Sequence, residues 1–81
     1  MPYIKPEDRE RIEQNICAVR TPGELNYVIT RLCLMYVEAN NDSYNTYNSL
    51  IGVLECAKLE FYRRAVAKYE DEKIQTNGDV Y

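Results

Sequence analysis

The sequence predicts an all-α fold of three helices, the last much the longest, forming a helical hairpin or bundle that homo-oligomerisation completes. Apolar residues recur every three or four positions over most of the chain, and strand-like alternation is confined to the first five residues. Only two clear turn signals interrupt this pattern, a Thr-Pro-Gly sequence at residues 21–23 and an Asn-Asn-Asp-Ser sequence at residues 40–43. These turns divide the chain into three helical stretches.

The first helix is expected over Pro6–Val19, after a lead-in of residues 1–5. Its opening proline is tolerated in the first turn, and the acidic residues that follow suit the positive end of the helix dipole. Ile12, Ile16 and Val19 then fall on one face at helical spacing.

The second helix is expected over Pro22–Ala39 and begins with a capping box. Thr21 caps the helix, and the side chain of Glu24 is expected to return to the amide of Thr21. Apolar residues cover more than half of the circumference, a pattern typical of a helix buried on several sides. The main stripe consists of Leu25, Val28, Ile29, Leu32 and Tyr36.

The third helix is expected over Tyr44–Gln75, capped by Asp42 or Ser43 and followed by a tail of residues 76–81 that contains Gly78 as a helix stop. At 1.5 Å per residue it would be about 45 Å long. Its stripe consists of Tyr47, Leu50, Leu54, Ala57, Phe61 and Ala65.

With 81 residues, the chain is expected to form a single helical domain over residues 1–81. Two short helices are too little to cover so long a third one, so a homo-oligomer is expected. Gly52, inside the third helix, would permit close approach of another helix. The alternative is a monomeric bundle in which the third helix curves or breaks at Gly52.

Composition excludes several function classes. The chain has no histidine, which removes His-dependent nucleophiles and His metal sites, and its net charge of −3 disfavours nucleic acid as a partner. Cys17, Cys33 and Cys56 form no C-x-x-C pair and are expected to be buried free thiols in a reducing compartment, with no metal and no cofactor. No segment resembles a signal peptide or a membrane span, so a cytoplasmic protein is expected.

No catalytic residue is assigned, and an enzyme is not expected. The spacing of Glu7, Glu10 and Glu13 matches the first half of the acidic motif of MazG-type, magnesium-dependent nucleotide hydrolases. The second half of that motif is missing, so the hydrolase remains a distant alternative. Acidic residues at a helix start are also what the helix dipole favours.

Four residues are candidates for binding a small anionic ligand between protomers. Arg63 and Arg64 suit a phosphate, Tyr62 suits a stacked base, and Arg31 lies in an otherwise apolar helix. The competing interpretation pairs Arg63 and Arg64 with Glu60 on the helix surface.

For Arg31, the competing interpretation is a snorkelling side chain or a salt bridge to Glu55 or Glu60. The tyrosines as a group suit interfaces, because each buries area while keeping one polar atom.

The sequence resembles a family of small bacteriophage and prophage proteins. The matching stretches are MPYIK at the start, GELNYVITR at 23–31, IGVLECAKLE at 51–60 followed by YRR at 62–64, and NGDVY at the end. The resemblance implies an accessory role in the bacterial cytoplasm and assigns no functional residue. By analogy with phage proteins of this size, the first hypothesis is a homo-oligomer that sequesters a nucleotide signal of host defence. The second hypothesis is a protein-interaction module that inhibits a host or phage protein.

Overall fold

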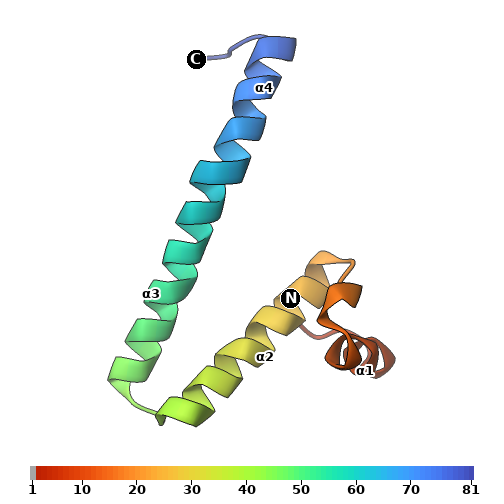
Figure 1. Cartoon of the computed structure of the whole chain (residues 1–81), viewed down its shortest axis with the longest axis vertical. Coiled ribbons are helices and arrows are strands. Elements are labelled where there is room, and N and C mark those ends of the chain that lie inside the picture. Colours follow the sequence, from red (N-terminus) through yellow and green to blue (C-terminus); the bar gives the residue numbers. More distant parts are fainter. Residues whose placement is uncertain (1) are drawn as a thin grey trace. The chain divides into compact units, whose positions relative to one another are not determined.

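A computed structural model describes residues 2–81, and every regular element in that range is a helix (Figure 1). This confirms the all-α prediction with a long C-terminal helix. The elements are α1 (Pro6–Gln14), a 3₁₀ turn η1 (Ile16–Ala18), α2 (Pro22–Asn40), α3 (Tyr44–Phe61), a π-helical turn η2 (Tyr62–Val66) and α4 (Ala67–Asn77).

The contacts within the chain divide it into two compact units, Met1–Thr46 and Tyr47–Tyr81. The first unit contains α1, η1, α2 and the first residues of α3. The second unit is the rest of α3 with η2, α4 and the tail. Each unit is described by itself.

The first helix ends earlier than the sequence predicted, at Gln14 instead of Val19. Asn15 is extended, with φ −152° and ψ 101°, and its side-chain oxygen accepts a hydrogen bond from the amide of Cys17. An asparagine that bonds a nearby backbone amide offers the chain an alternative to the helix. The helical spacing of apolar residues continues beyond Asn15 in the sequence, but α1 nevertheless ends just before Asn15.

Half of the expected capping box is present at the start of α2. The hydroxyl of Thr21 accepts a hydrogen bond from the amide of Glu24 at 3.1 Å, as the sequence predicted. The Glu24 carboxylate, however, accepts from the amide of Arg20 at 3.0 Å and not from that of Thr21. The carboxylate of Glu24 therefore holds the backbone of the loop before α2 through the amide of Arg20. It also forms an ion pair with Arg11.

Ser43, and not Asp42, supplies the polar contact at the start of α3. Its hydroxyl accepts from the amide of Thr46 at 3.3 Å. The buried Thr46 hydroxyl in turn donates to the carbonyl of Asn40 at 3.0 Å. These bonds tie the end of α2 to the first turn of α3.

In the second unit, α3, η2 and α4 form one continuous helix (Figure 1). It ends at Asn77, two residues beyond the prediction, and Gly78 follows with φ +91°. The helix does not break at Gly52, and nothing in the described residues comes within 4 Å of a Cβ built there. The π turn had no sequence signal.

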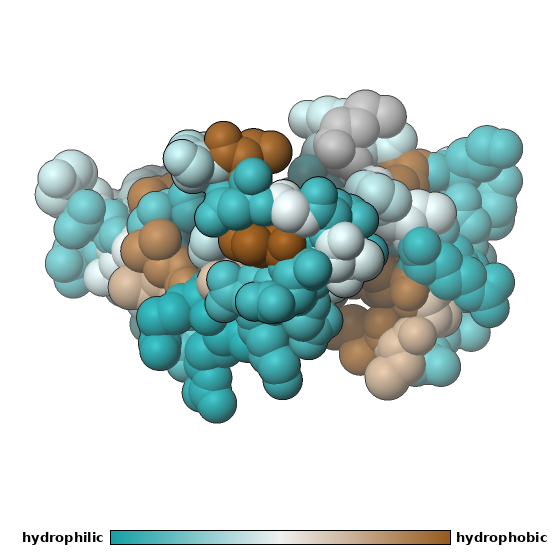
Figure 2. Space-filling view, turned by 90° about the horizontal axis from the view of Figure 1, so that it is seen from above, coloured by the Kyte–Doolittle hydropathy of each residue, from teal (hydrophilic) through white to brown (hydrophobic). Residues whose placement is uncertain are grey.

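The buried core is very small. Among the described residues only two hydrophobic side chains are buried, Ile12 and Tyr27. Large apolar side chains lie exposed instead, and Figure 2 shows apolar surface interspersed with polar side chains. On α2 the most exposed are Leu25, Leu32, Leu34 and Met35, and on α3 they are Tyr44, Ile51, Val53, Leu59 and Phe61.

The prediction that all three thiols are buried is wrong for a single chain. Cys17 and Cys56 are exposed, and Cys33 is half-buried. Cys17 follows the unexpected end of α1, and Cys56 lies on α3, which no element of its own unit covers.

Candidate functional site

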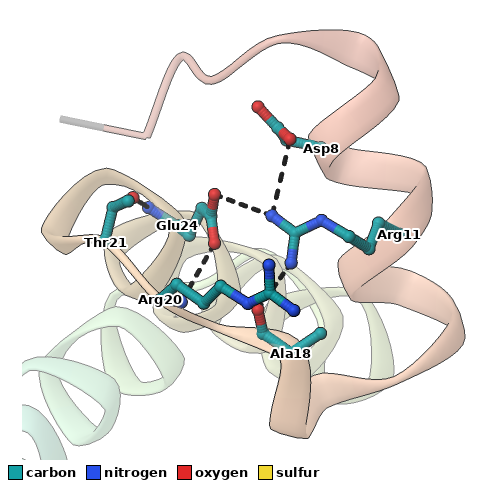
Figure 3. A network of polar contacts seen from close by, with 6 residues as sticks. All are labelled: Asp8, Arg11, Ala18, Arg20, Thr21 and Glu24. Carbon is teal, nitrogen blue, oxygen red and sulfur yellow. Dashed lines mark hydrogen bonds and ion pairs between the residues drawn. The ribbon is translucent and has the colours of Figure 1, made fainter.

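An arginine on α1 holds the first unit together (Figure 3). The Arg11 guanidinium donates to the carboxylate of Glu24 at 2.8 Å and also to the carbonyl of Ala18. A weaker contact of 3.4 Å reaches Asp8 on its own helix. One planar guanidinium thus joins α1, η1 and the start of α2, which suits its several donors in fixed geometry.

Both oxygens of the Glu24 carboxylate accept a hydrogen bond. Its side chain is buried, and its two oxygens accept from Arg11 and from the amide of Arg20. The hydrogen bond from Arg11 lowers the pKa of Glu24, although burial acts in the opposite direction. The same bond raises the pKa of Arg11. With its hydrogen-bonding groups engaged, this network is a structural clamp and leaves little capacity for a ligand.

A second polar cluster lies between α1 and α2. The hydroxyl of Tyr27 donates to the carboxylate of Glu13, and the Nε of Arg31 lies 3.7 Å from the same carboxylate. The hydrogen bond to Glu13, together with burial, raises the pKa of Tyr27. The guanidinium of Arg9 lies 5.8 Å from the centre of the Tyr27 ring.

Arg31, one of the four residues predicted to bind a ligand, belongs to this cluster. Besides a ligand or a snorkelling side chain, the sequence offered Glu55 or Glu60 as salt-bridge partners of Arg31, and the partner in the structure is Glu13. Glu13 was considered only as part of an acidic motif. Arg31 and Glu13 are each about half exposed, so their pairing leaves the guanidinium accessible.

An open apolar groove of about 350 Å³ begins at this cluster. The groove is lined by Ile12, Glu13, Ile16, Tyr27, Val28, Arg31, Leu32 and Met35. The lining residues come from the end of α1, from η1 and from α2.

The other three predicted ligand residues, Tyr62, Arg63 and Arg64, lie consecutively in the π turn. Arg63 and Arg64 both donate to Glu60, at 3.0 and 3.4 Å, and their side chains are more than 70% exposed. This is the surface pairing that the competing interpretation expected. Two guanidinium groups share one carboxylate, which leaves a local excess of positive charge.

Tyr62 is held by a hydrogen bond from its hydroxyl to the carboxylate of Glu70, eight residues on. This bond raises the pKa of Tyr62. It spans the π turn, where the wider helix turn adds one residue to the usual spacing. Short π turns are often found at functional sites.

Neither the Arg11–Glu24 clamp nor the π turn was found from the sequence. Arg11 is one of several charged residues in a polar first helix, and nothing in its spacing points to Glu24. No group of three or more Asp, Glu or Cys residues in the described part of the chain is arranged to hold a metal ion. Within residues 2–81, no helix is both long and apolar enough to cross a membrane.

The chain matches the family model described as "Domain of unknown function (DUF6899)" over residues 1–80, and it belongs to that family. The comparisons found no curated protein that matches the chain. They also found no solved structure that matches it.

Proposed function

We propose that this member of the DUF6899 family is a homo-oligomeric binding protein whose helices associate through their apolar faces. The observation that supports this proposal is the contrast between a core of two buried hydrophobic residues and many exposed ones. Burying two large side chains contributes only about 3–6 kcal/mol. That is small beside the backbone entropy lost on folding, which is about 1–2 kcal/mol for each ordered residue.

The exposed side chains are sufficient to drive association. Each large aliphatic or aromatic side chain contributes about 1.5–3 kcal/mol when it becomes fully buried. Leu25, Leu32, Leu34 and Met35 of α2 are each more than half exposed, and so is Phe61 of α3. An interface that buries these groups on two copies offsets the roughly 4–15 kcal/mol that association costs.

Light scattering coupled to size-exclusion chromatography tests the proposal. We expect a mass that is a multiple of 9.5 kDa at micromolar concentrations. A single species of 9.5 kDa across that range would contradict it.

A second candidate function is the binding of a small phosphate-bearing ligand, such as a nucleotide signal of host defence in a phage-infected cell. It is favoured by the exposed Arg63 and Arg64 in the π turn, which share one carboxylate. Guanidinium groups bind phosphate bidentately, and Tyr62 beside them offers a ring for a base. Arg31, beside the apolar groove of the first unit, is the remaining candidate.

A thermal-shift screen against cyclic and linear nucleotides tests this second candidate. We expect one nucleotide to raise the melting temperature and Arg63→Gln with Arg64→Gln to remove that rise. Lys58→Gln is the matched control, because Lys58 is equally exposed on the same helix and pairs with Glu55. Loss of the rise in the control as well would indicate a general charge effect and not a site.

The interaction with a host or phage protein is the remaining hypothesis. The same exposed apolar side chains of α2 and α3 support it, because they offer apolar surface that a partner protein could bury. A purified chain that stays monomeric but is stabilised by one defined protein partner would favour it over self-association.

A further inference from the structure

Two arginines line one open hollow of the first unit, and we propose that this hollow binds a nucleoside monophosphate. The hollow has a volume of about 410 Å³, and its lining comes from residues 2–3, from α1 and from α2. Sites for small molecules commonly have volumes of about 300–1,000 Å³. The inference goes beyond the functions proposed above, because of the residues named there it uses only Arg31 and none of those in the π turn.

Arg9 of α1 and Arg31 of α2 supply the positive charge of this hollow. The guanidinium of Arg9 lies 5.8 Å from the centre of the Tyr27 ring, and Arg31 pairs with the carboxylate that accepts the Tyr27 hydroxyl. The hydrogen bond to Glu13 raises the pKa of Tyr27, whereas the charges of Arg31 and Arg9 act in the opposite direction. Both guanidinium groups are therefore near one phenol, and a phosphate between them can accept hydrogen bonds from each.

Most hydrogen-bond donors of these two arginines have no partner among the described residues. The Arg9 side chain donates only from its Nε, to the carbonyl of Ile4 at 3.0 Å, which leaves both terminal nitrogens unpaired within residues 2–81. In the same part of the chain, Arg31 forms only its 3.7 Å ion pair with Glu13, and both of those side chains are about half exposed. Exposed ion pairs are weak, so a phosphate can bind the Arg31 guanidinium at little cost.

Two other groups in the hollow suit a nucleoside. The Glu13 carboxylate already accepts one hydrogen bond, from Tyr27, and has capacity for more, so the hydroxyls of a ribose can donate to it. Tyr3 lines the hollow and is 74% exposed, which leaves its ring open to a stacked base. Phosphate, sugar and base thus each have a suitable partner.

The backbone of the lead-in segment holds Tyr3 beside the hollow. The amide of Ile4 donates to the carbonyl of Pro2 at 2.9 Å, which forms a tight turn with Tyr3 at its centre. The carbonyl of Ile4 in turn accepts from Arg9. The arginine that lines the hollow therefore also anchors the segment that carries the aromatic ring.

The charge of the hollow favours a single phosphate over a nucleic acid strand. Its charged lining residues are Arg9, Arg31 and Glu13, so the two guanidinium groups outnumber the one carboxylate. The chain as a whole carries a net charge of −3. A nucleic acid strand requires an extended basic surface, whereas one phosphate requires only a local excess of positive charge.

NMR titration of the full, isotope-labelled chain tests this site. The probes are the monophosphates of adenosine, guanosine, cytidine and uridine, with the four nucleosides and inorganic phosphate as separate titrants. Arg9→Gln with Arg31→Gln is the main variant, and Lys58→Gln with Lys68→Gln is the matched control, because it also removes two positive charges. Tyr3→Leu is a further variant at an exposed position, which keeps the test decisive if the arginine variant loses helicity by circular dichroism.

We expect at least one monophosphate to shift the amide signals of residues 2–4, α1 and α2 saturably, and to bind more tightly than its nucleoside or inorganic phosphate. The arginine variant should weaken binding at least about tenfold, because hydrogen bonds between charged groups are strong. Tyr3→Leu should weaken it about fivefold through lost stacking. The lysine variant should bind as the parent does.

Four results would overturn the site. Signals that move only in the π turn would place the ligand there and would favour the second candidate function instead. Equal weakening in the lysine variant would show a general charge effect. Inorganic phosphate that binds as tightly as every monophosphate would remove the role of the nucleoside. A chain whose first unit responds to no monophosphate would leave the hollow without this ligand.

Discussion

The two units of this chain are held together in different ways. In the first unit, residues far apart in sequence meet: Arg11 binds Glu24, and Tyr27 binds Glu13. In the second unit, the ion pairs join residues only three or four positions apart, such as Arg63 and Glu60. The first unit therefore has tertiary structure of its own, whereas the second is a helix with local support only.

This difference shows where a partner is needed. Exposed i,i+3 and i,i+4 ion pairs stabilise a helix by only about 0.2–0.5 kcal/mol each. Most helix stability in proteins comes from packing of an apolar face. The second unit has such a face on α3 and nothing in its own unit to cover it, so its stability should depend on association more than that of the first unit.

The largest expected effect comes from a charge in the apolar stripe of α3. Leu54→Asp should weaken self-association by at least about a hundredfold, because an unpaired carboxylate would have to be buried, a change of about 3 kcal/mol or more. Sedimentation equilibrium measures the dissociation constant. Leu59→Asp is the control, because Leu59 is exposed on α3 but does not belong to the stripe that contains Leu54. If Leu54→Asp and Leu59→Asp weakened self-association equally, the stripe that contains Leu54 would not be the specific contact surface.

A smaller effect is expected from breaking the clamp of the first unit. Arg11→Ala leaves the buried carboxylate of Glu24 without its guanidinium and should lower the melting temperature of the first unit by several degrees. Amide signals of α1 and α2, followed by NMR on heating, report on this unit separately. Arg9→Ala is the comparison, because Arg9 bonds only the carbonyl of Ile4 and lies over the Tyr27 ring. An undiminished melting temperature in Arg11→Ala would show that the clamp is dispensable.

Acid should weaken the first unit through Glu24. Its pKa in the folded chain is lowered by Arg11, so its stabilising contribution is present above the usual value of 4.5 and is lost as the pH falls through the folded value. The same NMR signals, recorded in steps below pH 4.5, should fade in the first unit of the parent chain. Glu24→Gln should be less stable at neutral pH and should show a flatter response in this range.

The smallest effect is expected at Gly52 of α3. Gly52→Ala should stabilise the helix by about 0.5–1 kcal/mol, because alanine loses less backbone freedom and its Cβ meets nothing within 4 Å. Thermal unfolding monitored by circular dichroism measures the gain. A loss of stability would indicate that a second helix packs closely at Gly52 in the assembled protein.

The sequence predicted the helices better than it predicted their contacts. The start of α2 was found because Thr21 and Pro22 act within one turn of the chain, and Gly78 marked the end of α4 for the same local reason. The end of α1 was missed because the local hydrogen bond of Asn15 competed with an apolar period that continued to Val19. Two choices with similar local energies cannot be separated by periodicity alone.

The candidate site was predicted in part. The pairing of Arg63 and Arg64 with Glu60 followed from their helical spacing, and the structure confirms it. For Arg31 the sequence offered Glu55 or Glu60 as alternatives to a snorkelling side chain, and it missed Glu13, because an ion pair between helices depends on which helices lie side by side. The groove beside Arg31 was not predicted, because its lining depends on how the end of α1 and η1 lie against α2.

The sequence by itself determined that the chain is helical, where α2 and α3 begin, and that apolar residues exceed what so short a chain can cover. These properties depend on the spacing of residues and on caps within one turn. The tertiary structure alone decided that Arg11 joins α1 to Glu24, that Arg31 meets Glu13, and that a π turn carries Tyr62, Arg63 and Arg64. The two ion pairs depend on how α1 and α2 lie against each other, and the π turn depends on a small energy difference between helix types. The spacing of residues in the sequence reports neither.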